Sequence, residues 1–209
     1  MDSFFRDPAY YSYYGKWHSG WDINLDTGGD TDLGYPVQAM FAGEVLDAKS
    51  FPGWGINVRV RAFDHIRDYV STLIGEELEV LDANYCHLMQ HTVEVGDIVA
   101  AGDHLGSIGK GDRNQYLAHL HFELRKVDIP ANAPQLTGDA GFHETDRIYL
   151  DPKWLLSLDL TDYSTDLPPR RLVHVVNQVN LNGKELETSR VIVNRVGDKL
   201  WVRTENDNR

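Results

Sequence analysis

The sequence predicts a mainly β protein, with an antiparallel β-sandwich or barrel-like core, a short helix and a small β extension at the C-terminus. Short apolar runs recur from residue 20 onward and are separated by turns that contain glycine. Such even spacing of short strands is typical of β-sandwiches and barrels. The chain has 209 residues, of which 42% are hydrophobic and 25% charged, so it can bury one core of ordinary size.

Eight strands are expected before residue 126. Their ranges are Trp21–Leu25, Val37–Met40, Gly43–Ala48, Ile56–Ala62, Glu79–Leu88, Ile98–Ala100, His104–Ile108 and His119–Arg125. The turns between them contain Gly-Asp and Pro-Gly pairs, which are frequent in tight turns. Residues 1–17 are rich in Tyr and Phe and are expected to form an irregular arm that packs on the domain.

The predicted organisation has three consecutive segments. Residues 1–160 form the main domain, which ends with a short helix that Asp151 caps and Pro152 begins. Residues 161–171, which include two adjacent prolines, form a linker. Residues 172–209 form a small β extension. Its expected strands are Leu172–Leu181, Val191–Val196 and Leu200–Thr204.

The charge of the chain excludes two classes of partner. There are 32 Asp and Glu residues against 20 Lys and Arg, which gives a net charge of −12. Affinity for nucleic acid and for anionic membranes comes largely from Lys and Arg, so neither partner is expected. No run approaches the roughly eighteen apolar residues that span a bilayer. Cys86 is the only cysteine, which excludes an intrachain disulfide and a thiolate zinc cluster.

The run from Ala118 to Leu124 is the most informative part of the sequence. Side chains two apart on a strand share one face. His119, His121 and Glu123 therefore lie on one face of the expected strand, with apolar residues on the other. Imidazoles arranged in this way can converge on a metal or on a substrate.

Three more residues of metal-ligand type lie elsewhere in β-like runs. His18 and Asp22 are four apart, and His87 lies in the run that ends at Leu88. A catalytic zinc ion takes three nitrogen or oxygen ligands and keeps one position open for water. Imidazoles beyond these ligands are available for acid–base chemistry. The residue types alone leave open which histidines would bind metal.

The order of these motifs resembles the lysostaphin-type zinc metallopeptidases, which cut peptide crosslinks of bacterial peptidoglycan. The resemblance runs from about Trp17 to Leu155. Its elements are His18-Ser19-Gly20-Trp21-Asp22, Tyr35-Pro36-Val37, Gly53-Trp54-Gly55, Tyr85-Cys86-His87-Leu88, Val95-Gly96-Asp97, His119-Leu120-His121-Phe122-Glu123 and Asp151-Pro152.

The resemblance implies a role for each site residue. His18, Asp22 and His121 would ligate Zn²⁺, and His87 and His119 would be the catalytic pair that does not bind the metal. Glu123 and Tyr85 are candidates for contacting a ligand imidazole on its side away from the metal, where such a contact fixes the orientation of the ring. The alternative for Glu123 is a solvated carboxylate in a cleft. For Cys86, a buried inert thiol is expected rather than a nucleophile, on the side of the strand opposite His87.

Two insertions depart from the family pattern. They are Arg61–Asn84 and Lys126–Ile148, and each adjoins a strand that carries a catalytic histidine. We expect both to shape the substrate groove, with peripheral decoration as the alternative. For the extension over residues 172–209, a structural or assembly role is expected, with cell-wall binding as the alternative.

The resulting functional hypothesis is a monomeric zinc endopeptidase that cleaves stem or bridge peptides of peptidoglycan, at the cell wall or outside the cell. Met1–Tyr14 lacks the basic and apolar segments of a signal peptide. Either a signal lies outside this sequence or the protein reaches its target by another route. The alternatives are a non-catalytic wall-binding or regulatory protein, and a structural part of a phage tail or secretion machine.

Overall fold

The computed structural model describes residues 3–130 and 141–156 and four strands near the C-terminus, which lie within residues 178–204. The chain divides into two compact units, Met1–Tyr163 and Ser164–Arg209. No helix in the described part of the chain is long and apolar enough to cross a membrane.

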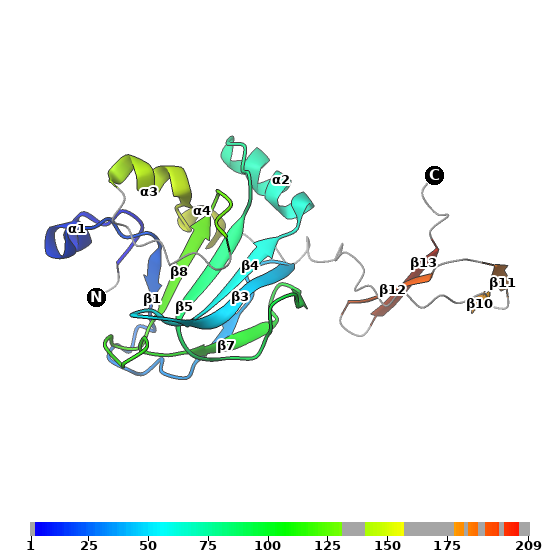
Figure 1. Ribbon diagram of the computed structural model, residues 1–209, viewed down its shortest axis with the longest axis horizontal. Coiled ribbons are helices and arrows are strands. Elements are labelled where there is room, and N and C mark those ends of the chain that lie inside the picture. The colour runs from blue at the N-terminus through cyan, green and yellow to red at the C-terminus, as the bar shows by residue number, and fades with distance from the viewer. Residues whose placement is uncertain are drawn as a thin grey trace. The chain divides into compact units, whose positions relative to one another are not determined.

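The first unit is built on one antiparallel sheet of nine strands, which confirms the predicted mainly β fold (Figure 1). The strands are β1 (Trp21–Ile23), β2 (Pro36–Gln38), β3 (Gly43–Phe51), β4 (Gly55–Ala62), β5 (Asp82–His91), β6 (Ile98–Val99), β7 (His104–Ile108), β8 (Leu120–Arg125) and β9 (Tyr149–Leu150). The main path runs β1-β8-β5-β4-β3-β6, and β7 pairs with both β5 and β2. This order places β1 beside β8, about one hundred residues further along the chain.

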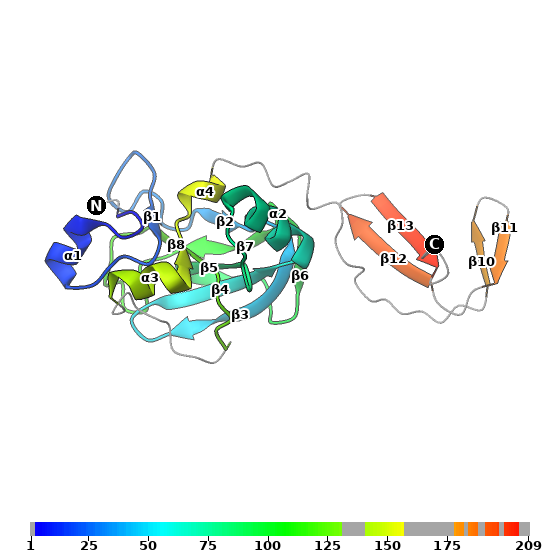
Figure 2. The same ribbon diagram turned by 90° about the horizontal axis from the view of Figure 1, so that it is seen from above.

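The described residues of the first unit also form helices, which accompany the sheet (Figure 2). They are α1 (Pro8–Tyr14), α2 (Asp64–Ile74), α3 (Phe142–Ile148) and α4 (Lys153–Leu156). The expectation of an irregular arm is therefore wrong for residues 8–14. The Asp7 side chain accepts a hydrogen bond from the Ala9 N–H, Pro8 begins the helix, and Gly15 ends it with φ at 69°. Asp151 caps α4 through the Lys153 N–H, as predicted.

Both predicted insertions contain a helix. α2 follows β4 directly and buries Ile66 and Val70. The second insertion covers an apolar cluster formed by Phe5, Ile129, Ile148 and Tyr149. Residues 131–140 of this insertion lie outside the described part of the chain.

A stripe of buried polar side chains crosses one face of the sheet. In the register between β8 and β5, His121 lies opposite Cys86, Glu123 opposite Asn84, and Arg125 opposite Asp82. All six residues are at most 4% exposed. The other face carries apolar pairs such as Phe122 and Tyr85. Buried polar groups need partners, so this stripe is where the sheet's specific chemistry is expected.

The second unit has two hairpin-like sheets. β10 (Gln178–Leu181) pairs with β11 (Lys184–Glu187), and β12 (Val191–Val196) pairs with β13 (Lys199–Thr204). β11 is a strand that the sequence prediction lacked. The predicted linker, residues 161–171, and residues 172–177 lie outside the described part of the chain.

Candidate metal centre

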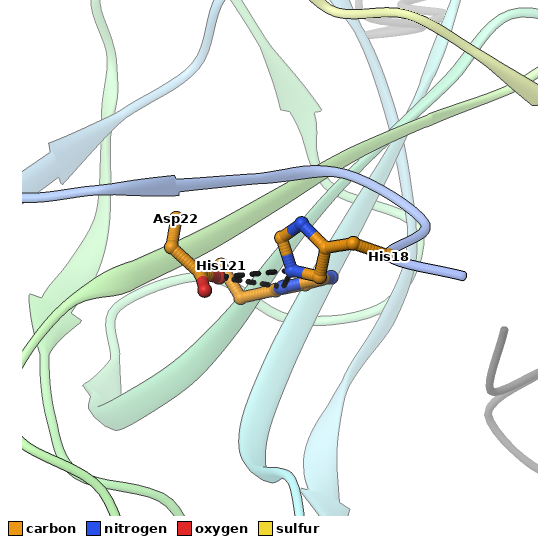
Figure 3. Close-up of side chains that lie close together, drawn as sticks. All are labelled: His18, Asp22 and His121. Carbon is orange, nitrogen blue, oxygen red and sulfur yellow. Dashed lines mark hydrogen bonds and ion pairs between the residues drawn. The ribbon is translucent and has the colours of Figure 1, made fainter. Parts of the chain in front are cut away.

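His18, Asp22 and His121 converge at the pair of strands β1 and β8 (Figure 3). Asp22 lies opposite His121 in the antiparallel register, and His18 lies just before β1. Asp22 Oδ1 is 2.9 Å from His121 Nδ1 and 3.2 Å from His18 Nε2. The two facing imidazole nitrogens are 3.0 Å apart. These three residues are the only such cluster among the described residues.

The hydrogen bonds behind each imidazole determine which nitrogen faces the centre. His18 Nδ1 lies 3.1 Å from the carbonyl oxygen of Phe4, and a carbonyl can only accept, so this nitrogen carries the proton. His121 Nε2 lies 3.2 Å from Glu123 Oε1 and donates to that carboxylate. His18 Nε2 and His121 Nδ1 are consequently the nitrogens that face Asp22 and would bind a metal, His121 Nδ1 after losing its proton.

His119 and His87 border the same centre. His119 Nδ1 donates to the Leu117 carbonyl at 2.8 Å, and its Nε2 is 3.5 Å from Asp22 Oδ1. His87 Nδ1 donates to the Trp54 carbonyl at 2.7 Å. The two rings meet edge to face, with centroids 4.8 Å apart. In each residue the backbone contact leaves Nε2 able to accept a proton.

Glu123 is a fully buried carboxylate, so the alternative of a solvated group is wrong. Besides His121, it accepts hydrogen bonds from Ser19 at 2.6 Å, from Asn84 at 3.0 Å and from Arg125 at 3.0 Å. Burial raises the pKa of a carboxyl group, but Arg125 and His121 outweigh it and hold the pKa of Glu123 well below its usual range. Glu123 is therefore an anion that faces His121.

The electrostatics of the site separate its ionisable groups. Burial opposes ionisation of Asp22, but its interactions with the His121 and His18 imidazoles hold its pKa well below the usual value. Burial also lowers the pKa of His121, yet Asp22 and Glu123 overcome this and raise it to about 9. Burial, with the neighbouring imidazoles of His121 and His119, lowers the pKa of His87 to about 3. His87 is thus a neutral base beside the charged Asp22 and His121 side chains.

Two local backbone features bring these side chains together. A Cβ on Gly20 would lie 2.1 Å from the Phe122 carbonyl oxygen, so only glycine lets β1 lie this close to β8. His87 has φ at 67°, in the left-handed region that non-glycine residues rarely adopt. The register between β4 and β5 also shifts between Tyr85 and Leu88, where β5 has one residue more than β4. This bulge brings the His87 ring to the same side of the sheet as Cys86.

Strict alternation predicted that Cys86 and His87 face opposite sides of the strand. This prediction is wrong, because both side chains lie on the same side of the sheet. Its sulfur accepts from Asn84 Nδ2 at 3.1 Å, and the same amide donates to Glu123. Cys86 is fully buried. Burial, and then the Glu123 charge, raise the pKa of its thiol well above the ordinary value. A buried thiol that stays protonated fits the expected inert role.

Tyr85 lies on the apolar side of the sheet. Its hydroxyl oxygen accepts from the Met40 N–H at 2.7 Å, and its ring packs against Phe122. These contacts belong to the core, so Tyr85 has no part in the site that we propose below.

An open cleft of about 710 Å³ is lined by the five candidate site residues, which are His18, Asp22, His87, His119 and His121. Its other lining residues include Tyr10 and Tyr14 of α1, Trp17, Trp54, and residues 115–117 before β8. No described residue of either insertion lines the cleft. We expected the insertions to shape the groove, but their described parts do not line it. The N-terminal helix α1 forms one wall of the cleft instead. The aromatic composition of residues 1–17 was the available signal for this wall.

The donor set fits a zinc ion. Two imidazole nitrogens and one carboxylate oxygen, from residues that are largely buried, are ligands that Zn²⁺ takes in catalytic sites. The carboxylate behind His121 is a frequent companion of such ligands.

The sheet and the cluster define the class of protein: a mainly β protein with a candidate metal centre in an open cleft. The model of peptidase family M23 matches residues 16–133, more than half of the chain. The chain therefore belongs to peptidase family M23, as its resemblance to the lysostaphin-type enzymes predicted. A comparison with curated protein sequences found no match.

Solved structures of the family are also similar to this chain. A putative M23 peptidase from Pseudomonas aeruginosa has 24% identity and a TM-score of 0.41, over 66% of this chain and 43% of that one. The catalytic domain of prophage-encoded EnpA from Enterococcus faecalis has 25% identity and a TM-score of 0.42, over 62% and 82%. The catalytic domain of lysostaphin from Staphylococcus simulans has 23% identity and a TM-score of 0.43, over 69% and 83%. The chain thus spans less than half of the Pseudomonas protein.

Proposed function

We propose that the chain is a zinc-dependent endopeptidase that hydrolyses peptide bonds in peptidoglycan stem or cross-bridge peptides. The observation that carries this proposal is the His18–Asp22–His121 cluster in a cleft that also holds His87 and His119. Membership of peptidase family M23 supports the peptidase chemistry. The choice of peptidoglycan rests on the lysostaphin-type resemblance.

In this proposal His18 Nε2, Asp22 Oδ1 and His121 Nδ1 hold the zinc ion. A zinc ion in such a site polarises the scissile carbonyl and lowers the pKa of its water towards about 7. Three protein ligands leave a coordination position open for that water. Glu123 holds the His121 ring in the tautomer whose Nδ1 is unprotonated.

His87 and His119 share the proton transfers. One imidazole, unprotonated at Nε2, accepts the proton of the attacking water. The other imidazole, which carries a proton on Nε2, donates a hydrogen bond to the developing oxyanion and then gives that proton to the departing amine. In both rings Nε2 is the nitrogen that exchanges protons, because the carbonyls of Trp54 and Leu117 accept from the Nδ1 atoms. Burial lowers the pKa of both imidazoles, which keeps the proton-accepting form available at neutral pH.

The net charge bears on how the protein would reach its substrate. Bacterial walls are anionic, so a chain with a charge of −12 is repelled by them. We therefore propose that attachment or proximity delivers the enzyme to the wall, where it acts as a monomer.

Digestion of purified sacculi tests the proposal. Wild-type chain should release soluble fragments, a chelator should abolish release, and added Zn²⁺ should restore it. His119→Ala should be inactive at equal zinc content. His104→Ala is a matched control, because His104 is exposed on β7, outside the cleft, and should digest like wild type. Cleavage that a chelator does not affect, or no cleavage with zinc restored, would overturn the proposal.

A non-catalytic wall-binding or regulatory role would give a different result. Such a protein could bind sacculi without releasing fragments at any zinc concentration. The presence of all five candidate residues in one cleft favours the enzyme over this alternative.

A further inference from the structure

We infer that the N-terminal arm, residues 3–14, is a working part of the metal centre. In this inference the Phe4 carbonyl and the Tyr10 ring are positioning groups that hold His18 ready to bind the metal. The inference rests on the proposed function only in taking His18 as a metal ligand. Residues 3–14 lie outside residues 16–133, which the family model matches.

The arm is hydrogen-bonded to the segment that carries two of the ligands. The Asp22 N–H donates to the Ser3 carbonyl at 2.8 Å, and the Arg6 N–H donates to the His18 carbonyl at 2.9 Å. These two bonds lie at either end of the His18–Asp22 segment. The arm therefore restrains the backbone at both ends of the segment that carries His18 and Asp22.

One atom of the arm selects the tautomer of His18. The Phe4 carbonyl oxygen accepts from His18 Nδ1 at 3.1 Å. His18 is 2% exposed, so water cannot readily replace this acceptor. With the proton held on Nδ1, Nε2 keeps the lone pair that a metal requires.

An aromatic contact holds the plane of the same ring. The Tyr10 ring in α1 lies 4.6 Å from the His18 ring, tilted by 37°, and Tyr14 packs behind Tyr10 at 4.5 Å. Tyr10 and Tyr14 also line the cleft. The arm thus restrains His18 from the backbone side and from the ring face.

The second insertion anchors the arm. Phe5 is buried against Ile129, Ile148 and Tyr149. Arg6 forms an ion pair with Asp146 of α3 at 2.8 Å. Its guanidinium lies 4.2 Å from the centre of the Phe142 ring in the same helix. Figures 1 and 2 both show α1 and α3 at the same end of the sheet. This gives the insertion a role: it supports the arm that supports His18.

Zinc affinity of full-length variants tests the inference directly. Tyr10→Ala removes the ring from His18. Replacing Phe5 by its α-hydroxy acid turns the Phe4–Phe5 amide into an ester, which weakens the Phe4 carbonyl as an acceptor. Tyr13→Ala is the matched control, because Tyr13 lies in the same helix and is 81% exposed. Competition with a chromogenic chelator gives the dissociation constant for Zn²⁺, and thermal melting of the metal-free chains reports folding.

Tyr10→Ala and the ester should each bind Zn²⁺ about tenfold more weakly than wild type, while Tyr13→Ala should match wild type. In the zinc-bound wild type, nitrogen-15 NMR should find the His18 proton on Nδ1, shielded from exchange. If Tyr10→Ala and the ester both fold and bind Zn²⁺ like wild type, the inference is overturned and the proposed function stands. If a variant does not fold, the NMR result decides, because a proton found on Nε2 overturns the inference. A wild-type chain that takes up no zinc overturns both.

Discussion

Asp22 lies directly opposite His121 in the β1–β8 register, with Asp22 Oδ1 2.9 Å from His121 Nδ1. Facing residues of adjacent antiparallel strands have side chains on the same side of the sheet. Two proposed metal ligands about one hundred residues apart are therefore brought together by strand pairing itself. The site needs no flexible loop to bring Asp22 and His121 together, which gives it the rigidity that a catalytic metal centre requires.

The close approach of β1 to β8 predicts an effect at Gly20. Gly20→Ala places a methyl group 2.1 Å from the Phe122 carbonyl oxygen, so β1 must move away from β8. We expect a loss of about 2 kcal/mol or more in the free energy of unfolding, together with weaker zinc binding. Chemical denaturation and a zinc titration measure the two effects.

Gly141→Ala is the control for this substitution. A Cβ at Gly141 meets nothing within 4 Å. Because Gly141 is the N-cap of α3, the change should cost at most about 1 kcal/mol and leave zinc affinity unchanged. Equal behaviour of the two variants would contradict the close contact at Gly20.

Loss of the Glu123 charge should affect both stability and metal binding. In Glu123→Gln the buried Arg125 loses one anionic partner, and breaking a buried ion pair costs up to about 3–5 kcal/mol. The His121 ring also loses the carboxylate that fixes its tautomer, so zinc affinity should fall roughly 10–100-fold. Glu94→Gln, at an exposed position, is the control and should change neither quantity. Wild-type zinc affinity in a folded Glu123→Gln chain would show that the carboxylate does not position His121.

The Cys86 thiol should be unreactive in the native protein. Its pKa is raised by burial and by the Glu123 charge, so the reactive thiolate is scarce even at pH 9, where an ordinary thiol with a pKa of about 8.5 is mostly ionised. A chromogenic disulfide reagent, read by its absorbance, should detect almost no thiol in the folded chain and one thiol per chain in denaturant. Fast, full reaction of the native protein would contradict the buried position of Cys86.

The acidic charge predicts an unusual salt dependence of wall binding. Salt screens the repulsion between an acidic chain and an anionic wall. Pull-down of the chain with intact sacculi should therefore be weak at low ionic strength and should increase, or stay unchanged, as salt is added. Tight binding that weakens with added salt would contradict the idea that attachment or proximity delivers the enzyme.

Local sequence patterns were sufficient for eight of the nine strands of the sheet, all but β9, and for finding the residue types of the site. Period-two alternation and glycine turns predicted β8, on which His121 and Glu123 share one face. The spacing of His18 and Asp22 predicted that the two could act together. Their convergence with His121, however, depends on the pairing of β1 with β8. Only the family resemblance predicted that these three residues belong to one site.

Two of the errors came from features that local patterns do not encode. The face of the sheet that His87 occupies depends on a left-handed φ at a residue that is not glycine, for which the sequence has no signal. The helix α1 did have a signal, because Asp7 and Pro8 form the same cap pattern that was recognised at Asp151. The role of the second insertion depends on its packing against the arm, which is a tertiary contact.

Mass spectrometry of the fragments that zinc-loaded protein releases from sacculi in ¹⁸O-labelled water tests the central claim most directly. Hydrolysis of a peptide bond should leave one heavy oxygen on the new carboxyl group of a stem or bridge peptide, with the glycan bonds intact. His119→Ala with the same zinc content should yield no such fragment. Labelled peptide termini in the wild type alone would agree with the account. Intact peptides, cleavage confined to glycan bonds, or equal cleavage by His119→Ala would contradict it.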